Sequence, residues 1–401
     1  MKVSIYFNSP IPEAGGEYTL LKTICEEFSK YNSKYEIVFC YKGSPFGLYK
    51  KSIDGFDWIN INRGLINHFF GLFWKRIKRH VYDFIKLFFF KQPSYGFESV
   101  WDEIAEKEHI SLYWFTGPVN ELLTTPFVFT EFDMGHRVLP FLPEVSKPAG
   151  IMESRDSMNN RLLSRAFCVI TGNETGKQEI LMNHRINPDK IRIIDFPISF
   201  FTKGKQHKPS QIKEGEIFFF YPAQFWSHKN HTCIIDALII LKKKYGKCPS
   251  VYFTGSDKGN LSYIKKQIKK LGLESQVKIL GFVSFEELNY LYQNAQAMIY
   301  ASLMGPNNLP PYEAAAHCCP LIITNLPGHI EQMQDAALFF DGTKPSELAD
   351  KMADVLNHQE LCDSLKIKEK RLMKKFENYS YAKEMMKIID EFEIYHHTFS
   401  D

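Results

Sequence analysis

Residues 216–257 read EIFFFYPAQFWSHKNHTCIIDALIILKKKYGKCPSVYFTGSD. A short apolar run opens this stretch, apolar residues at helical spacing follow up to Gly246, and a second short apolar run comes at 250–254. Segments of the same two kinds then alternate from VKILGFV (277–283) to PSELADKMADVLNH (345–358). Strands that alternate with helices predict a doubly wound parallel sheet of the α/β class.

The N-terminal half carries the same alternation. KVSIYFN (2–8) predicts a strand that leads into a Pro/Gly-rich loop and a helix, and YEIVFCYKG (35–43) predicts the next parallel strand. Further strands are predicted at 111–115, 126–132, 168–172 and 191–197.

A lysine-rich stretch without apolar periodicity marks a linker at 201–215. We therefore expect two Rossmann-like domains, at 1–200 and 216–377. Ligands of open α/β sheets bind at the carboxyl ends of the strands, so the two domains predict a cleft between facing sheet edges.

The composition argues against a disordered chain, a nucleic-acid-binding protein and a disulfide-rich secreted protein. The 401 residues are 44% hydrophobic and 24% charged, which is typical of a globular chain, and the net charge of +3 does not favour nucleic acid as a partner. The eight cysteines form no CxxC pair and no zinc-finger spacing, and the N-terminus lacks a secretory signal. We expect a cytoplasmic protein with reduced thiols.

Residues 64–92, GLINHFFGLFWKRIKRHVYDFIKLFFFKQ, combine an apolar helical face with clustered basic residues. This pattern favours an interfacial helix on anionic lipid over a transmembrane span, because charges interrupt every long apolar run. A core helix of the N-terminal domain with a solvated basic face is the alternative. The expected membrane contacts are Phe73, Trp74, Lys75, Arg76, Lys78 and Arg79.

The stretch from Tyr300 to Glu331 carries the clearest chemistry: YASLMGPNNLPPYEAAAHCCPLIITNLPGHIE. A predicted strand ends at Ser302, a Gly/Pro/Asn loop follows, and the loop leads into a helix that carries Glu313. Backbone amides of Asn307, Asn308 and Leu309 at this helix N-terminus would suit a diphosphate. Glu313 could accept hydrogen bonds from a ribose, or it could merely complement the helix dipole.

This stretch resembles the signature of family 4 retaining glycosyltransferases, which have the GT-B fold. In that family two carboxylates separated by seven residues precede a helix of small residues. Glu313 matches the second carboxylate, which the resemblance implies holds the nucleotide ribose. The first falls on Gly305, as in a subgroup with a Gly-Pro-Thr-Asn-like donor loop, so Asn307 and Asn308 are expected to recognise the sugar with amides.

Other positions match the family. Lys229 in YPAQFWSHKNH matches a lysine that neutralises the diphosphate, and Gln224 stands where arginine is usual. The remaining expected donor contacts are Gly15 and Gly16 of the N-terminal glycine loop, Gly255, Phe282, Val283 and Glu287. The resemblance also implies that a C-terminal helix at 378–395 crosses back onto the N-terminal domain.

PFVFTEFDMGHRVLPFLPEV (126–145) resembles the family's acceptor-side strand, with Phe132 in place of the usual histidine. Asp133 and His136 are the candidate catalytic residues here, beside Lys229 and Glu313, and a structural cap is the alternative for His136. Glu131 and Asp133 only resemble a metal-binding Asp-x-Asp, so we expect no metal and no cofactor besides the donor.

The expected function is retaining transfer of a hexose from a UDP- or GDP-sugar. The acceptor would be a polysaccharide or a lipid-linked oligosaccharide of a surface polysaccharide such as O-antigen, capsule or exopolysaccharide, at the inner face of the plasma membrane. A catalytically impaired, membrane-associated scaffold that binds nucleotide sugars is the main alternative. A Rossmann oxidoreductase is a weaker one, because GxGxxG is absent after the first strand.

Overall fold

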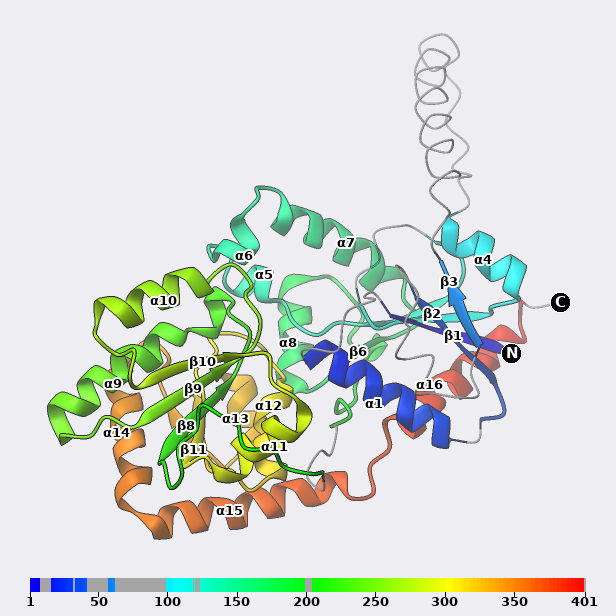
Figure 1. Cartoon of the computed structure of the whole chain (residues 1–401). Coiled ribbons are helices and arrows are strands. Elements are labelled where there is room, and N and C mark those ends of the chain that lie inside the picture. Colours follow the sequence, from blue (N-terminus) through cyan, green and yellow to red (C-terminus); the bar gives the residue numbers. More distant parts are fainter. Residues whose placement is uncertain are drawn as a thin grey trace.

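The computed structural model describes residues 1–7, 16–31, 33–41, 57–61, 99–117, 119, 123–198 and 204–399. Two parallel sheets, of seven and six strands, are each flanked by helices (Figure 1). The predicted α/β class with two Rossmann-like sheets is therefore confirmed. No helix in these described ranges is both long enough and apolar enough to span a bilayer.

The seven-stranded sheet has the order β3-β2-β1-β4-β5-β6-β7. Its strands are β1 (Lys2–Phe7), β2 (Glu36–Tyr41), β3 (Asp57–Asn60), β4 (Leu112–Phe115), β5 (Phe127–Thr130), β6 (Val169–Thr171) and β7 (Ile191–Ile193). The interior strand β1 pairs with both neighbours, so that Val3 lies between Ile37 and Leu112. The central residues of most of these strands are apolar because helices cover both faces of the sheet.

The helices of this half are α1 (Gly16–Lys30), α4 (Val100–Glu108), α5 (Gly135–Val138), α6 (Pro143–Ser146), α7 (Ile151–Arg165) and α8 (Glu174–Asn183). The last helix of the chain, α16 (Tyr381–His396), also packs here. Its buried Met385 and Ile389 share a core with Leu21 and Ile24 of α1. The Tyr35 hydroxyl donates to Asp390 at 2.7 Å, so the C-terminal helix is tied to the first sheet.

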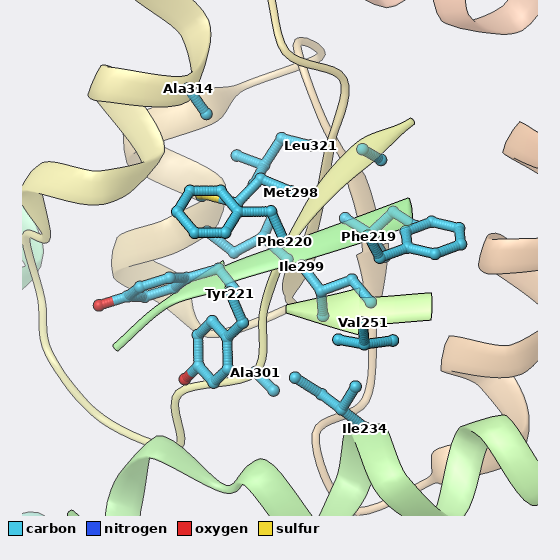
Figure 2. Packing of buried hydrophobic residues seen from close by; sticks show 14 of the residues in the cluster. Phe219, Phe220, Tyr221, Ile234, Val251, Met298, Ile299, Ala301, Ala314 and Leu321 are labelled. Carbon is cyan, nitrogen blue, oxygen red and sulfur yellow. The ribbon is translucent and has the colours of Figure 1, made fainter. Parts of the chain in front are cut away.

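The six-stranded sheet has the order β10-β9-β8-β11-β12-β13. Its strands are β8 (Phe218–Pro222), β9 (Ser250–Thr254), β10 (Val277–Gly281), β11 (Ala297–Tyr300), β12 (Leu321–Thr324) and β13 (Leu338–Phe340). Figure 2 shows its centre, where Phe220 of β8 and Met298 of β11 lie together and Ile234 approaches from a flanking helix. Aromatic and aliphatic side chains from the strands and from the flanking helices fill this core.

The helices around the second sheet are α9 (His231–Tyr245), α10 (Leu261–Lys270), α11 (Phe285–Asn294), α12 (Leu309–Ala316), α13 (Pro327–Met333), α14 (Pro345–Asn357) and α15 (Gln359–Met373). Neither α15 nor the short β3 is among the predicted elements. The expected basic helix at 64–92, with its membrane contacts, and Gly15 lie outside the described residues.

Hydrogen bonds join the two halves near the carboxyl ends of their strands. Glu331 of α13 accepts hydrogen bonds from the backbone amides of Glu174 and Thr175, each at 2.8 Å, and so caps α8. Asn307 donates to the carbonyl of Gly172 at 3.0 Å. The amide of His228 donates to Glu144 of α6 at 2.8 Å. The loops that follow β5, β6, β8 and β11 therefore meet at one place.

Candidate functional site

Lys229 ends a short 3-10 helix, Ser227–Lys229, that follows β8. Its ammonium group lies 2.9 Å from the Tyr300 hydroxyl and 3.4 Å from the Ser302 hydroxyl, and 5.2 Å from the centre of the Tyr300 ring. Among the described residues, no carboxylate oxygen lies within 4.0 Å of this ammonium. The half-buried ammonium is thus held by neutral oxygens, and no described carboxylate balances its charge.

The turn around Lys229 is fixed by the sheet. The Tyr221 hydroxyl donates to the carbonyl of Lys229 at 2.6 Å, and the amide of Leu303 donates to the carbonyl of His228 at 2.8 Å. Gln224 lies in the same loop, where its side-chain oxygen accepts a hydrogen bond from the Trp226 ring at 3.2 Å. Gln224 therefore shapes the loop but adds no positive charge beside Lys229.

Asn308 connects this cation to the loop after β11. Its side-chain oxygen accepts from the Tyr300 hydroxyl at 2.8 Å, and its amide nitrogen lies 3.1 Å from the Gly305 carbonyl and 3.0 Å from Nε2 of His329. Burial lowers the pKa of His329 to about 4, so the ring is neutral near pH 7 and Nε2 accepts. The result is a rigid polar network that adds no charge of its own.

The start of α12 offers fewer donors than expected. The amide of Asn308 already donates to the side chain of Gln332 at 3.2 Å, and Pro310 and Pro311 have no N–H. In this structure the Asn308 amide is therefore not available to an anion unless the Gln332 side chain moves, and the predicted anion site stays a prediction. Of the first three residues of α12, only Leu309 has an amide to present.

Glu313 is the fifth residue of α12 and lies beyond the first turn, so it does not merely complement the helix N-terminus. Its side chain is buried, and one carboxylate oxygen accepts from the Tyr292 hydroxyl of α11 at 2.7 Å. Burial raises the pKa of Glu313, against the opposing effect of this hydrogen bond. In the described part of the chain, no hydrogen bond reaches its other oxygen, Oε1.

Gly305, which occupies the position of the family's first carboxylate, has a φ of 115° that L side chains rarely adopt. A Cβ on it would lie 2.7 Å from the side-chain nitrogen of Asn308 and 2.9 Å from its oxygen. The Asn308 amide thus occupies the space beside Gly305 that a larger side chain would need.

Asn307 does not lie with Asn308. Its amide nitrogen bridges to Gly172 of the first half, and its side-chain oxygen is buried without a hydrogen-bond partner among the described atoms. The Asn307 side chain therefore joins the two halves in this structure, and its predicted contact with a sugar stays a prediction.

Several expected donor contacts have structural roles. Gly255 has a φ of 124°, and a Cβ there would lie 2.6 Å from the carbonyl oxygen of Ala223, so the glycine permits close approach of two loops. Glu287 forms a capping box with Ser284 at the start of α11. Phe282 is 59% exposed after β10, whereas Val283 packs against the core. Gly16 is the first residue of α1.

On the acceptor side, Asp133 follows β5 and is held through one carboxylate oxygen. Its Oδ1 accepts from the amide of Gly135 at 2.7 Å and lies 3.2 Å from the Arg155 guanidinium. Burial would raise the pKa of Asp133, but Arg155 and that amide outweigh it and hold the pKa below its usual value. Burial raises the pKa of the neighbouring Glu131 to about 8, with Arg155 opposing. Asp133 is therefore ionised and weakly basic.

His136 does not reach the place where the loops meet. Its side chain is completely buried in α5, and Nε2 lies 3.0 Å from Asp156 of α7. The short α5 turns this candidate catalytic ring inward against α7, into the interior of the first half.

A depression of about 380 Å³ lies on the other side of the 3-10 turn. It is bordered by Pro143 of α6, Ser227, and polar residues of α9 and the start of α10 such as Asp236 and Asn260. Neither Lys229 nor Asn308 lines this depression, so it is separate from the polar network around the Lys229 ammonium.

The sequence analysis did not single out Tyr300, Tyr292 or His329. Each is a polar group inside an apolar run or a helix, and only contacts across the sheet reveal its partner. Tyr300, the last residue of β11, had the one usable signal, because a strand end at this edge of a parallel sheet is where ligand contacts gather.

Comparison with known proteins finds a family and relatives that match part of this chain. Residues 202–372 match the family Glycosyl transferases group 1. The O-antigen chain mannosyltransferase RfbU of Salmonella typhimurium is 26% identical over 203 residues, which are 51% of this chain and 54% of that protein. This chain thus aligns with about half the length of that relative.

Solved structures resemble the whole chain. Anabaena Alr3699/HepE in complex with UDP-glucose has a TM-score of 0.68 at 13% identity, over 98% of this chain and 99% of that one. WaaG, a glycosyltransferase involved in lipopolysaccharide biosynthesis, has a TM-score of 0.67 at 12% identity, over 96% and 99%. The fold is therefore the GT-B arrangement, and residues 202–372 are the part of the chain that matches the group 1 glycosyltransferase family.

Proposed function

We propose that this protein is a retaining glycosyltransferase that moves a hexose from a UDP- or GDP-sugar to a polysaccharide or a lipid-linked oligosaccharide. The observation that carries the proposal is Lys229: an ammonium group at the carboxyl ends of β8 and β11, oriented by Tyr300 and Ser302 and without a carboxylate partner among the described residues. A cation held in this way suits the diphosphate of a nucleotide sugar.

Transfer breaks the bond between the sugar C1 and a diphosphate oxygen, and negative charge develops on the leaving diphosphate. A positioned cation stabilises that charge most in the transition state and so lowers the barrier. In our proposal Lys229 supplies this stabilisation, and the hydroxyls of Tyr300 and Ser302 keep its ammonium in place. No metal is required for this step.

Glu313 is proposed to bind the ribose hydroxyls through Oε1, with Tyr292 holding the other oxygen. The burial of Glu313 favours this role because a short, oriented carboxylate loses little freedom on binding. Asn308 is proposed to face the sugar in place of the family's first carboxylate. Its position beside Gly305 supports replacement of that carboxylate over simple loss, and so favours an active enzyme over an impaired scaffold.

The donor and acceptor classes rest on the relatives. RfbU is named a mannosyltransferase of O-antigen chains, the Anabaena structure contains UDP-glucose, and WaaG is involved in lipopolysaccharide biosynthesis. A surface polysaccharide or its lipid-linked precursor is the acceptor class that these proteins support together.

The test is thermal stabilisation of the purified protein by UDP-, GDP- and dTDP-sugars, by the free nucleotide diphosphates and by NAD(P)H. We expect one nucleotide sugar to raise the Tm, the Lys229→Ala variant to lose the response, and Lys243→Ala, an exposed lysine of α9, to keep it. Stabilisation by NAD(P)H alone would favour the oxidoreductase. A nucleotide sugar that binds but is not turned over would favour the scaffold.

We further propose that Phe73, Trp74, Lys75, Arg76, Lys78 and Arg79 hold the protein on the inner face of the plasma membrane. Replacing the four basic residues by glutamine should release the protein from anionic liposomes at moderate salt, because each contributes about 1 kcal/mol near such a surface. Co-sedimentation measures this. Unchanged binding would restore the alternative of a core helix with a solvated face.

A further inference from the structure

A second group of side chains, away from Lys229, brings together ligands that metals prefer. His136 of α5, Asp156 of α7 and His184 at the end of α8 each place one ligand atom within 4.8 Å of the others. The two histidines are buried, and the side chain of Asp156 is 15% exposed. Three separate elements of the first half thus converge on one buried point.

The hydrogen bonds around this group leave ring nitrogens ready to bind. Nδ1 of His184 lies 2.9 Å from the side-chain oxygen of Asn160, so Nδ1 carries the proton and Nε2 carries a lone pair. Nε2 is buried and has no hydrogen-bond partner among the described atoms. A histidine that donates through one nitrogen and presents the other is the arrangement found around protein-bound metals.

The other two members already contact each other, and Nδ1 of His136 is buried without a hydrogen-bond partner among the described atoms. Nε2 of His136 lies 3.0 Å from Oδ1 of Asp156. Arg137 donates to the same carboxylate through Nε at 2.7 Å and also contacts Oδ2 through a terminal nitrogen, so its guanidinium orients both oxygens. Metal-binding carboxylates commonly have such a second hydrogen-bond partner.

We propose that His136, Asp156 and His184 bind a divalent transition metal, with Zn²⁺ as the cation that this ligand set fits best. Two imidazole nitrogens and one carboxylate oxygen are a known set for zinc, and a water would complete four-coordination. Zinc–ligand distances of about 2.1 Å in a tetrahedron place ligand atoms about 3.4 Å apart. A pair of ligand atoms at the 4.8 Å limit must therefore close by about 1.4 Å, which side-chain rotation can supply.

The site would act on structure and does not depend on the proposed sugar transfer. Asp133 lies three residues before His136, and Arg155, which binds Asp133, is adjacent to Asp156. A bound ion would therefore lock α5, α7 and α8 around the loop after β5. The nearby guanidinium groups of Arg137 and Arg155 oppose a dication, so we expect weaker binding than in a zinc finger.

The experiment uses the full chain after chelator treatment and gel filtration, with Zn²⁺ alone as the probe. Isothermal titration should give one equivalent, and Zn²⁺ at about 100 times its Kd should raise the Tm by about 5 °C. Asn160→Ala removes the exposed side chain that accepts from Nδ1 of His184, and should weaken Zn²⁺ binding about 10- to 100-fold. His184→Gln should abolish the binding, and His207→Gln, an exposed histidine of the loop before β8, should leave it unchanged.

Co²⁺ provides a spectroscopic readout that does not depend on a variant's folding. The wild-type protein should show the visible bands of four-coordinate Co²⁺ without a thiolate charge-transfer band, and Zn²⁺ should displace them. The proposal is overturned if the wild-type protein binds no Zn²⁺. It is equally overturned if thiolate bands appear, or if Asn160→Ala and a folded His184→Gln bind as the wild-type protein does.

Discussion

Two loops of similar length follow strands at the same edge of their sheets, and they treat charge in opposite ways. After β5, Asp133 is paired with Arg155, and Arg137 is paired with Asp156 of α7. After β8, the described neighbours of the Lys229 ammonium are hydroxyls. A half-buried charge without a counter-ion costs stability. The difference indicates that the second loop keeps its charge for a ligand, whereas the first uses its charges to hold its own shape.

The largest expected effect comes from removing that charge. Lys229→Ala should weaken binding of the free nucleotide diphosphate by 10- to 100-fold, because a charge-assisted hydrogen bond contributes about 1.5–3 kcal/mol. Isothermal titration measures the change. Lys243→Ala is the matched control and should bind as the wild-type protein does; equal losses in both variants would refute a special role for Lys229.

A carboxylate restored at position 305 should damage the site. Gly305→Asp forces a side chain into a backbone with φ 115° and within 2.7 Å of Asn308, which should lower the free energy of unfolding by about 1–3 kcal/mol. Chemical denaturation measures this loss. Gly272→Asp is the control, because Gly272 has a φ of 64° with open space around it. A Gly305→Asp variant as stable as this control would contradict the packing described above.

Acid should destabilise the half that carries Lys229. Burial lowers the pKa of His329 to about 4 and that of His231 to about 3, from an ordinary value of 6.5. Between the folded-state pKa of each ring and 6.5, the unfolded chain binds more protons than the folded chain does. The free energy of unfolding is therefore highest above pH 6.5 and decreases as the pH falls. Each ring should remove about 2 kcal/mol between pH 7.5 and pH 5.

His231→Phe separates one ring from the other, since His231 stacks on Phe225 with ring centres 4.5 Å apart and phenylalanine can occupy its place. Denaturation curves at pH 7.5 and pH 5 should show a smaller acid loss in this variant. A loss identical to that of the wild-type protein would mean that His231 does not titrate between the two states.

The smallest effect is expected on the other loop. Asp133→Asn should reduce turnover less than tenfold, because the carboxylate is already neutralised by Arg155 and is a weak base. Steady-state kinetics with a responding donor measure this. A loss of a hundredfold or more would place Asp133 in the chemistry and would remove the contrast between the two loops.

Most of the fold could be predicted from the sequence, because short apolar runs alternate with amphipathic helices from residue 216 onward. The short β3 has too few residues to show a period, and α15 carries charges on most of its surface. Both therefore escaped prediction.

The candidate site was predictable at Lys229 and much less elsewhere. The burial of Glu313 depends on Tyr292 of another helix, and the inward turn of His136 depends on Asp156 of α7. No local pattern encodes such partners. Only its backbone angle and the position of the Asn308 side chain explain why residue 305 is a glycine.

The central claim is that Lys229 stabilises the diphosphate that leaves a nucleotide sugar. The most direct measurement is release of nucleotide diphosphate from the stabilising nucleotide sugar by wild-type protein, Lys229→Ala and Lys243→Ala. The account predicts release by the wild-type protein and Lys243→Ala, and a rate at least about 100-fold lower for Lys229→Ala. Equal rates in all three proteins would contradict it.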